Sequence, residues 1–275
     1  MAFRMAFSRR RVPLIAPVAK LLRARQVHAN GARLDAAPFK FSAENFRDPQ
    51  LPHGLEVRNV PLTPATEEAL QGYGRLISTA DEISVENGNF EIVRWPQPGW
   101  RELDPQTGDE AGTTEGNFEV HWSGDFYYAH NLAINTENNY YLDGISAPPE
   151  LARRSEPAAG DGSYIYLWMS DYHPDGAQLF FPAQPIPFVV CLGSREHGDD
   201  IKPGHMRAFA VPAGKGIYLD PSTWHNGVYV APCHTPARFL TRQGRVHARV
   251  SCSWAAEYHT LLRVPLVATV DADHV

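Results

Sequence analysis

The feature that most constrains the fold is a succession of short apolar segments that begins at Tyr164. Each segment is rich in β-branched and aromatic residues and is followed by a turn signal of Gly, Pro, Asp or Asn. A spacing of about 10 to 15 residues suits antiparallel hairpins in a small barrel. A mainly β fold with a few short helices is therefore predicted, with strands in "YIYLWMSDYH", "AQLFFP", "PFVVCLG", "MRAFAVP", "GIYLDP" and "GVYVAP".

The N-terminal half carries similar aromatic segments, "FEIVRW", "FEVHWSG", "FYYAHNLAI" and "YYLDG". One helix is predicted before them, over residues 60–77, where Thr63 can cap the start and Gly72 and Gly74 can end it. Residues 147–163 read as a surface excursion or a hinge. We expect a single domain over residues 35–275, with an N-terminal half at about 55–146 and a motif-bearing half at about 164–265.

Composition excludes several classes of function. The chain has 275 residues, 43% of them hydrophobic, and its net charge of −6 offers no basic patch for nucleic acid. The sequence has no apolar run of about 18 residues and hence no expected membrane-spanning helix. It also lacks a phosphate-binding loop and a dinucleotide fingerprint, so no nucleotide cofactor is expected.

The three cysteines, Cys191, Cys233 and Cys252, share no close spacing. Their odd number fits buried thiols in a reducing compartment better than a disulfide framework or a zinc knuckle. Cys191 lies in a predicted apolar strand with no base nearby in sequence, so we expect no nucleophilic role for it.

The first 34 residues are predicted to lie outside the folded domain. They contain seven arginines, one lysine and no acidic residue, and "VAKLLRARQV" can form a short helix with a basic face. This composition is typical of a mitochondrial transit peptide, and it predicts a location in the mitochondrial matrix. The alternative is a basic arm on a cytoplasmic protein.

Polar residues at regular spacing interrupt the apolar strands in "SDYHPDGAQLFFP". Asp171 and His173 are two residues apart, so on a strand they project from the same face. Gln178 follows the turn signal "PDG" and can return beside them on the next strand. Further along, His225 follows a second turn and is preceded by Trp224. These residues predict one polar site inside the barrel.

This pattern resembles the two motifs of the cupin fold, a jelly-roll β-barrel. The first cupin motif has two histidines one residue apart and then an acid or glutamine, and Asp171, His173 and Gln178 occupy those places. The second motif is a Gly-led strand and turn that closes on a third histidine, which residues 214–225 match. The resemblance implies a cupin-like β-barrel.

A narrower resemblance is to the ureidoglycolate lyase family. The segments that carry it are "PLTPATEEALQGYGRLI", "YHPDGAQLFFP", "FVVCLG", "MRAFAVPAGKGIYLDPSTWHNGVY" and "RFL". It is strongest over residues 164–240 and reappears at 60–77. Those enzymes cleave ureidoglycolate to glyoxylate and urea in purine and allantoin breakdown, so the resemblance implies a carbon–nitrogen lyase. Four positions depart from the expected motifs. Asp220 and Ser222 stand where Pro and Gly are usual, Pro185 replaces the Gly that ends the first motif, and Asn226 stands where the family has a second histidine.

The residues suggest two forms of chemistry. Asp171, His173, Gln178 and His225 offer two imidazoles and two oxygen donors, a set that suits nickel, manganese, iron or zinc. Without a metal, His173 or His225 would serve as the base, because an imidazole titrates near neutrality. Arg207 is a candidate clamp for a carboxylate. The remaining candidate substrate contacts are Gln178, Tyr218, Trp224 and Asn226.

Each candidate has a structural alternative. A histidine in a β protein is often a hydrogen-bonded structural residue, and Asp171 can pair with an arginine at the barrel rim. Arg207 can pair with Asp199. Arg245, His247 and Arg249 alternate on one strand face, which is either a second wall of the site or solvated surface.

Two other functions remain open at the level of sequence. The same fold can act on another small hydroxy acid, or it can bind a ligand or build an assembly without catalysis. Cupin barrels often pair through exposed strands, so a homodimer is expected.

Overall fold

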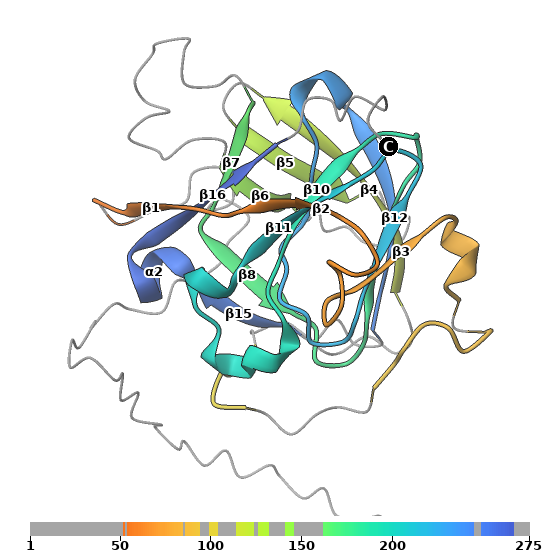
Figure 1. Ribbon diagram of the computed structural model, residues 1–275, viewed down its shortest axis with the longest axis horizontal. Helices are drawn as coiled ribbons and strands as arrows, with labels where there is room; N and C mark the ends of the chain where they lie inside the picture. Colours follow the sequence, from red (N-terminus) through yellow and green to blue (C-terminus); the bar gives the residue numbers. More distant parts are fainter. Residues whose placement is uncertain are drawn as a thin grey trace, which may run out of the picture. The chain divides into compact units, whose positions relative to one another are not determined.

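The dominant regular structure among the described residues is the β-strand, and the strands lie around a common interior (Figure 1). The computed structural model describes residues 52, 54–84, 86–93, 99–103, 114–123, 126–131, 141–145, 162–244 and 249–266. The predicted transit peptide at 1–34, most of the segment 147–163, and Arg245 and His247 lie outside these ranges.

The largest sheet has ten strands within the described residues. In spatial order they are β1 (Glu56–Asn59), β16 (Thr260–Pro265), β7 (Tyr164–Leu167), β6 (Tyr141–Ile145), β5 (Phe126–Asn131), β4 (Thr114–Ser123), β14 (Ala237–Gln243), β9 (Gln178–Pro182), β12 (Gly216–Leu219) and β3 (Gly74–Ile77). Apart from the parallel pair β1–β16, its neighbours are antiparallel.

Two smaller sheets complete the β structure of the described part. One has the order β13 (Val228–Tyr229), β10 (Phe188–Leu192), β11 (Arg207–Val211) and β2 (Leu62–Pro64), and the other pairs β15 (Val250–Ser253) with β8 (Met169–Tyr172). The helical elements are short: η1 (Ala80–Glu82), η2 (Arg195–Asp200), η3 (Pro203–His205), η4 (Pro232–His234) and α2 (Trp254–Tyr258). The predicted mainly β, cupin-like architecture is confirmed.

The four-stranded sheet packs face to face on the ten-stranded one. Phe188 of β10 meets Phe239 of β14 with ring centroids 5.2 Å apart, and Phe239 also stacks on Phe118 of β4 at 5.5 Å. The ring centroid of Tyr127 on β5 lies 5.6 Å from that of Tyr229 on β13. These side chains are buried, so the main hydrophobic core fills the space between the two sheets.

The predicted strands after Tyr164 are all present as β7 to β13, but the predicted helix at 60–77 is wrong. Its two ends are strands: β2 pairs in parallel with β11, and β3 pairs with β12. Only a turn lies between them, in which Thr66 Oγ1 accepts from the amide of Ala69. Edge pairing to two sheets outweighs the local helix signals, because short helices are marginal without a packed face.

The expected hairpin around "PDG" is also wrong in its pairing. A turn does occupy residues 174 and 175, but β8 pairs with β15, whereas β9 pairs with β12 and β14. The chain therefore crosses from the two-stranded sheet to the ten-stranded sheet at this turn. His173 therefore directly follows β8 in the chain, and β8 does not pair with the strand that carries Gln178.

The thiols behave as expected at two of three positions. Cys191 and Cys252 are buried, and burial raises the pKa of Cys191 to about 12. Such a thiol stays protonated at neutral pH, which fits the expected absence of a nucleophilic role. Cys233, in contrast, is exposed on η4.

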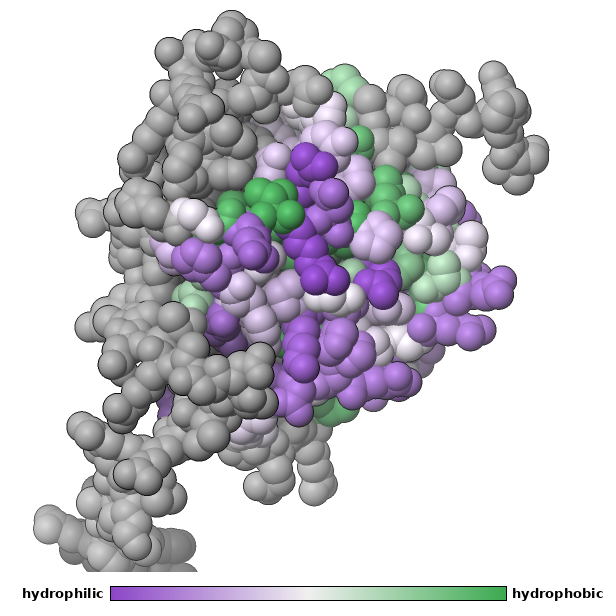
Figure 2. Space-filling view, turned by 60° about the vertical axis from the view of Figure 1, so that its left-hand side comes forward, coloured by the Kyte–Doolittle hydropathy of each residue, from purple (hydrophilic) through white to green (hydrophobic). Residues whose placement is uncertain are grey.

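Figure 2 shows one face of the molecule on which hydrophilic side chains predominate and apolar surface is confined to separate patches. Scattered apolar patches of this kind are usual for a protein surface. In the part of the chain that the structure describes, no helix is both long and apolar enough to cross a membrane.

Candidate metal and substrate site

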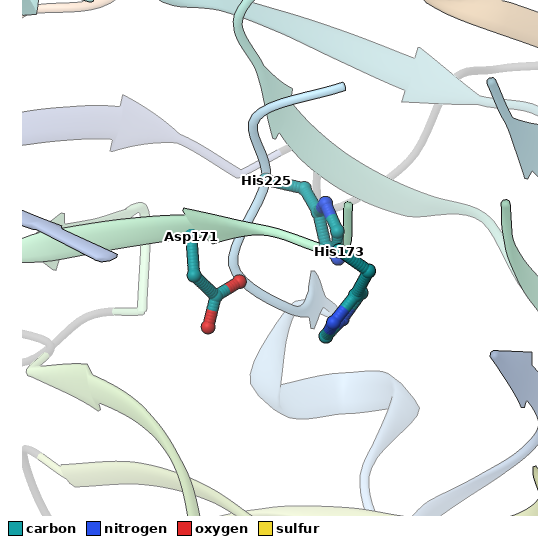
Figure 3. A group of neighbouring side chains, drawn as sticks. All are labelled: Asp171, His173 and His225. Atoms are coloured by element: carbon teal, nitrogen blue, oxygen red, sulfur yellow. The ribbon is translucent and has the colours of Figure 1, made fainter. Parts of the chain in front are cut away.

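The first half of the site comes from β8 and the residue that follows it. Asp171 and His173 alternate with Tyr172, so the two project to one side while Tyr172 projects to the other. Figure 3 shows Asp171 and His173 turned toward the same space, with His225 reaching it from a neighbouring segment. The predicted common face of Asp171 and His173 is confirmed.

The second half comes from the bridge at residues 224 and 225. The amide of Asp171 donates to the carbonyl of His225 (2.7 Å), and the amide of His225 donates back to Asp171 (2.8 Å). Trp224 makes the equivalent pair with Gly193 at the end of β10. A Cβ atom at Gly193 would lie 2.8 Å from Ile201 Cδ1 and 2.9 Å from Met206 Sδ, so a larger residue there would require these two side chains to shift. The bridge fixes His225 against β8 through the backbone.

The turn before the bridge explains one departure from the cupin motif. Ser222 has φ of 65°, in the left-handed region that favours glycine. Its amide donates to the carbonyl of His173 (3.3 Å), which ties the turn to the other half of the site. The site therefore keeps the backbone shape that a glycine would adopt there, at the conformational cost of a serine.

A buried ion pair holds the opposite side of β8. Arg101 donates from both terminal nitrogens to the carboxylate of Glu257, at 2.9 and 2.8 Å, and its backbone amide donates to Asp199 Oδ2 (2.8 Å). The other oxygen of Asp199 accepts from the hydroxyl of Tyr172 (2.9 Å). Because Tyr172 is anchored in this way, its neighbours Asp171 and His173 stay directed to the inner side.

Asp171, His173 and His225 form one buried group. Each offers a ligand atom, and these atoms all lie within 4.8 Å of one another. The imidazole centroids of His173 and His225 are 5.1 Å apart. Among the described side chains, these three form the group of His, Cys, Asp or Glu residues whose spacing could hold a metal ion.

The tautomer of His225 suits a metal ligand that binds through Nε2. Its Nδ1 lies 2.8 Å from the carbonyl oxygen of Thr223, and because a carbonyl can only accept, Nδ1 carries the proton. This tautomer leaves the lone pair on Nε2, as in histidines that bind metals. Burial lowers the pKa of His225 to about 4, so the ring is neutral at pH 7.

That pKa corrects one part of the sequence analysis. We expected that, without a metal, either His173 or His225 would serve as the base, because an imidazole titrates near neutrality. A buried imidazole with a pKa of about 4 is a weak base at neutral pH, because the pKa of an efficient general base lies near the working pH. The role that fits His225 is that of a neutral ligand.

The arginine side chain that lies beside the group is that of Arg249, not that of Arg207, which was the predicted carboxylate clamp. Arg249 Nε is 3.7 Å from Asp171 Oδ2, which matches the predicted pairing of Asp171 with an arginine. The sequence analysis left Arg249 open between a wall of the site and solvated surface. Arg207 is exposed on β11 and donates to the carbonyls of Gly204 and Met206, so the structure does not bring it to the group.

Tyr218 lies on the outer face of the same strands that carry Gln178. Tyr218 pairs with Leu179 and packs with Phe90 in a separate cluster, and its hydroxyl accepts from the amide of Glu91 (3.2 Å). Side chains of successive strand residues point to opposite faces. The expectation that Tyr218 points into the site is therefore wrong, because Gln178 pairs with Leu219, one residue out of phase with Tyr218.

Gln178 is almost fully buried, with 1% of its surface exposed. Its Nε2 makes a short hydrogen bond to Thr241 Oγ1, whereas its Oε1 has no donor among the described residues. An amide oxygen buried in this way is available as an acceptor or as a metal ligand. Gln178 was predicted to contact the substrate or a metal, and this oxygen is the atom through which it could do so.

The two remaining candidates are engaged with the protein itself. Trp224 is fully buried in the core, and its Nε1 donates to the carbonyl of Gly198 (2.9 Å). The amide of Asn226 accepts from the Tyr229 hydroxyl (2.9 Å) and donates to the carbonyl of Met169 (3.4 Å). Asn226 therefore links the bridge to β13 and β8, a structural role that its place in the motif did not suggest.

The three-residue group fits a divalent metal ion. A metal ion about 2 Å from each ligand atom accommodates donors up to about 4 Å apart, close to the observed spread. Two imidazoles and a carboxylate suit first-row transition metals, and the tautomer of His225 directs a lone pair outward. A buried Asp-His-His group that could hold a metal is thus present.

The fold and the site together define a class of protein: a mainly β protein of cupin-like architecture with a polar group in its interior. Residues 130–257 of the chain match the family model described as ureidoglycolate lyase. The match includes the whole of the Asp171, His173 and His225 group, and the resemblance to the family is confirmed over this range. It extends beyond the span 164–240 on which we based the resemblance and leaves out residues 60–77.

Individual relatives carry the same description. Ureidoglycolate lyase of Rhodobacter capsulatus is 39% identical over 73 residues, which is 26% of this chain and 42% of the relative. Ureidoglycolate lyase of Mesorhizobium japonicum is 38% identical over 78 residues, which is 28% of this chain and 44% of the relative. The chain therefore aligns with less than half of the length of these relatives.

Proposed function

We propose that this protein is a carbon–nitrogen lyase that cleaves ureidoglycolate to glyoxylate and urea. The observation that carries the proposal is the buried group of Asp171, His173 and His225 inside the segment that matches the ureidoglycolate lyase family. The relatives of that name are 30–39% identical to this chain over the aligned residues.

The reaction needs a balanced transfer of one proton. Ureidoglycolate carries a hydroxyl and a ureido nitrogen on the same carbon. Loss of the hydroxyl proton forms the carbonyl of glyoxylate, the bond from that carbon to nitrogen breaks, and the departing urea nitrogen gains a proton. The site must therefore favour the deprotonated hydroxyl, hold the carboxylate and receive the urea group.

We further propose that Asp171, His173 and His225 hold a divalent ion, nickel, manganese, iron or zinc. When bound, such an ion lowers the pKa of a coordinated hydroxyl. The neutral imidazole of His225 supplies a ligand that needs no deprotonation at pH 7. If the protein works without a metal, His225 is a poor base, because burial disfavours its protonated form, and His173 is then the candidate base.

Arg249 is the proposed partner of the substrate carboxylate. Its guanidinium lies at the edge of the group, 3.7 Å from Asp171, with 28% of its side chain exposed. A guanidinium can bind a carboxylate through two parallel hydrogen bonds.

The test is release of both products by the purified full chain. Protein freed of metal is reloaded separately with nickel, manganese, iron and zinc, and urea and glyoxylate are measured after addition of ureidoglycolate. We expect equal amounts of the two products with at least one metal or with none added. Absence of both products under every loading would contradict the proposed reaction.

A second function is favoured by a specific departure. The family's second histidine is Asn226 here, and its amide is engaged with Tyr229 and Met169. A changed motif suits a site reshaped for another small hydroxy acid, or one that binds without catalysis. If a small hydroxy acid binds but ureidoglycolate is not cleaved, this second function replaces the first.

We propose the mitochondrial matrix as the location, on the composition of residues 1–34 alone. Import of the full chain into isolated mitochondria, compared with a chain that begins at residue 35, tests it. Uptake of both chains, or of neither, would contradict this location.

A further inference from the structure

Two buried amide oxygens face the interior of the barrel without a donor among the described residues. They are Oε1 of Gln178 on β9 and Oε1 of Gln243 at the end of β14. Leaving a buried acceptor without a hydrogen bond is costly, so such atoms are rare in folded proteins and indicate a partner that is supplied from outside the chain.

The two glutamines lie on adjacent strands and on the same face. β9 and β14 pair antiparallel, with Thr241 opposite Phe180 and Arg242 opposite Leu179. One step further in the same register, Gln243 comes opposite Gln178. The hydrogen bond from Gln178 to Thr241 confirms the common face, because Thr241 and Gln243 are two residues apart on β14.

This face is the one that carries the candidate site. Phe180, two residues from Gln178 and hence on the same side of β9, has its ring centroid 6.2 Å from that of His225. The side-chain amides of Gln178 and Gln243 therefore lie next to Phe180 on the inner face. The bond to Thr241 occupies Nε2 of Gln178, which leaves its oxygen as the group that a ligand can meet.

The chemistry of the pair selects a neutral donor of hydrogen bonds. Amide oxygens accept but carry no full charge, so they suit N–H groups of an amide or a urea better than an ammonium ion or a metal ion alone. We propose that Gln178 and Gln243 bind the terminal N–H groups of the ureido end of the substrate and so set specificity for ureido acids. This inference rests on the proposed function and adds Gln243, which is outside the predicted set of site residues.

Two unreactive ligands of nearly equal shape test the proposal. N-carbamoylglycine ends in an NH₂ group, and N-acetylglycine has a methyl group in its place. Their dissociation constants are measured by calorimetry with the full chain. We expect N-carbamoylglycine to bind about tenfold more tightly, because the methyl compound leaves two buried acceptors unpaired.

The variant Gln243→Met removes one acceptor with little change of volume. We expect the preference for N-carbamoylglycine to fall to about threefold or less, with the affinity for N-acetylglycine unchanged within about twofold. Gln178→Met should act in the same direction, and Gln71→Met, at an exposed position, is the matched control that should keep the preference.

Three results would overturn the inference. Equal affinity of the wild-type protein for the two ligands would do so, as would an unchanged preference in both glutamine variants. Loss of bound metal in Gln178→Met would reassign that side chain as a metal ligand. Turnover of ureidoglycolate by the wild-type protein, measured in the same series, separates the two claims: turnover without preference overturns the inference alone, and no turnover with no binding of either ligand overturns both.

Discussion

The inner and outer faces of β9 and β12 each carry one predicted site residue, Gln178 and Tyr218, but only the inner face belongs to the candidate site. Gln178 and Phe180 face inward, where Phe180 contacts His225. Leu179 and Tyr218 face outward into a separate cluster, where Arg75 lies 4.2 Å from the centroid of the Tyr218 ring. The two faces differ by one residue of register along the same strands.

The comparison shows that strand alternation, more than residue type, decides which side chains can act together. Tyr218 is a tyrosine close in sequence to His225, yet its hydroxyl is committed to Glu91. Arg249, which the sequence left open between a wall of the site and solvated surface, lies beside Asp171 because β15 pairs with β8. Predictions on the two faces should therefore differ in kind: binding and turnover on the inner face, and stability alone on the outer face.

The largest expected effect is on turnover by inner-face histidines. His173→Ala and His225→Ala should each lower kcat/KM for ureidoglycolate on the order of 1000-fold, because each removes a ligand or a base from the reacting centre. Steady-state release of glyoxylate measures it. His234→Ala on η4 is a matched control outside the group and should retain activity. A wild-type kcat/KM in either histidine variant would show that the inner face is not the reacting centre.

The next effect is a dependence of stability on pH that comes from His225. Its pKa is about 4 in the folded protein and 6.5 in the unfolded chain, so the unfolded state binds more protons between these values. Stability from this group is complete above about pH 6.5 and is lost as the pH falls through 4, by up to about 3 kcal/mol.

Denaturant unfolding of the metal-free protein at pH 7 and pH 4 measures this loss against His225→Asn, which lacks the titrating group. The advantage in unfolding free energy of the wild type over the variant should shrink toward pH 4. A constant difference between the two proteins across this range would show that the His225 environment is more polar than the structure indicates.

A smaller effect separates the two arginines. Arg249→Gln should raise KM for ureidoglycolate about 10- to 100-fold with a lesser change in kcat, as expected for loss of a charged hydrogen bond to the carboxylate. Arg207→Gln, on the exposed side of β11, should leave both constants unchanged. The reverse order of the two variants would restore Arg207 as the clamp.

The smallest effect belongs to the outer face. Tyr218→Phe removes the hydroxyl that accepts from Glu91 and should lower the free energy of unfolding by about 1 kcal/mol. Its kcat/KM should remain that of the wild type, which a parallel assay checks. A clear loss of activity in the folded variant would mean that the outer cluster reaches the site.

The sequence predicted the strands after Tyr164 and the common face of Asp171 and His173, because both depend on local alternation. It also predicted His225 as their partner, through the spacing of a known motif. What it could not predict was non-local: the reciprocal bond between Asp171 and His225, the place of Arg249, and the register that brings Gln243 opposite Gln178. The wrong helix at 60–77 has the same cause, because pairing with β11 and β12 overrides local propensity.

The central claim is that Asp171, His173 and His225 hold a metal ion on the inner face. Elemental analysis of the full chain after dialysis against a slight excess of each candidate metal, run beside His225→Ala and Tyr218→Phe, tests it most directly. The account predicts about one ion per chain in the wild type and in Tyr218→Phe, and at least a 100-fold weaker affinity in His225→Ala. A wild-type protein that retains no metal, or a His225→Ala variant that retains as much as the wild type, would contradict it.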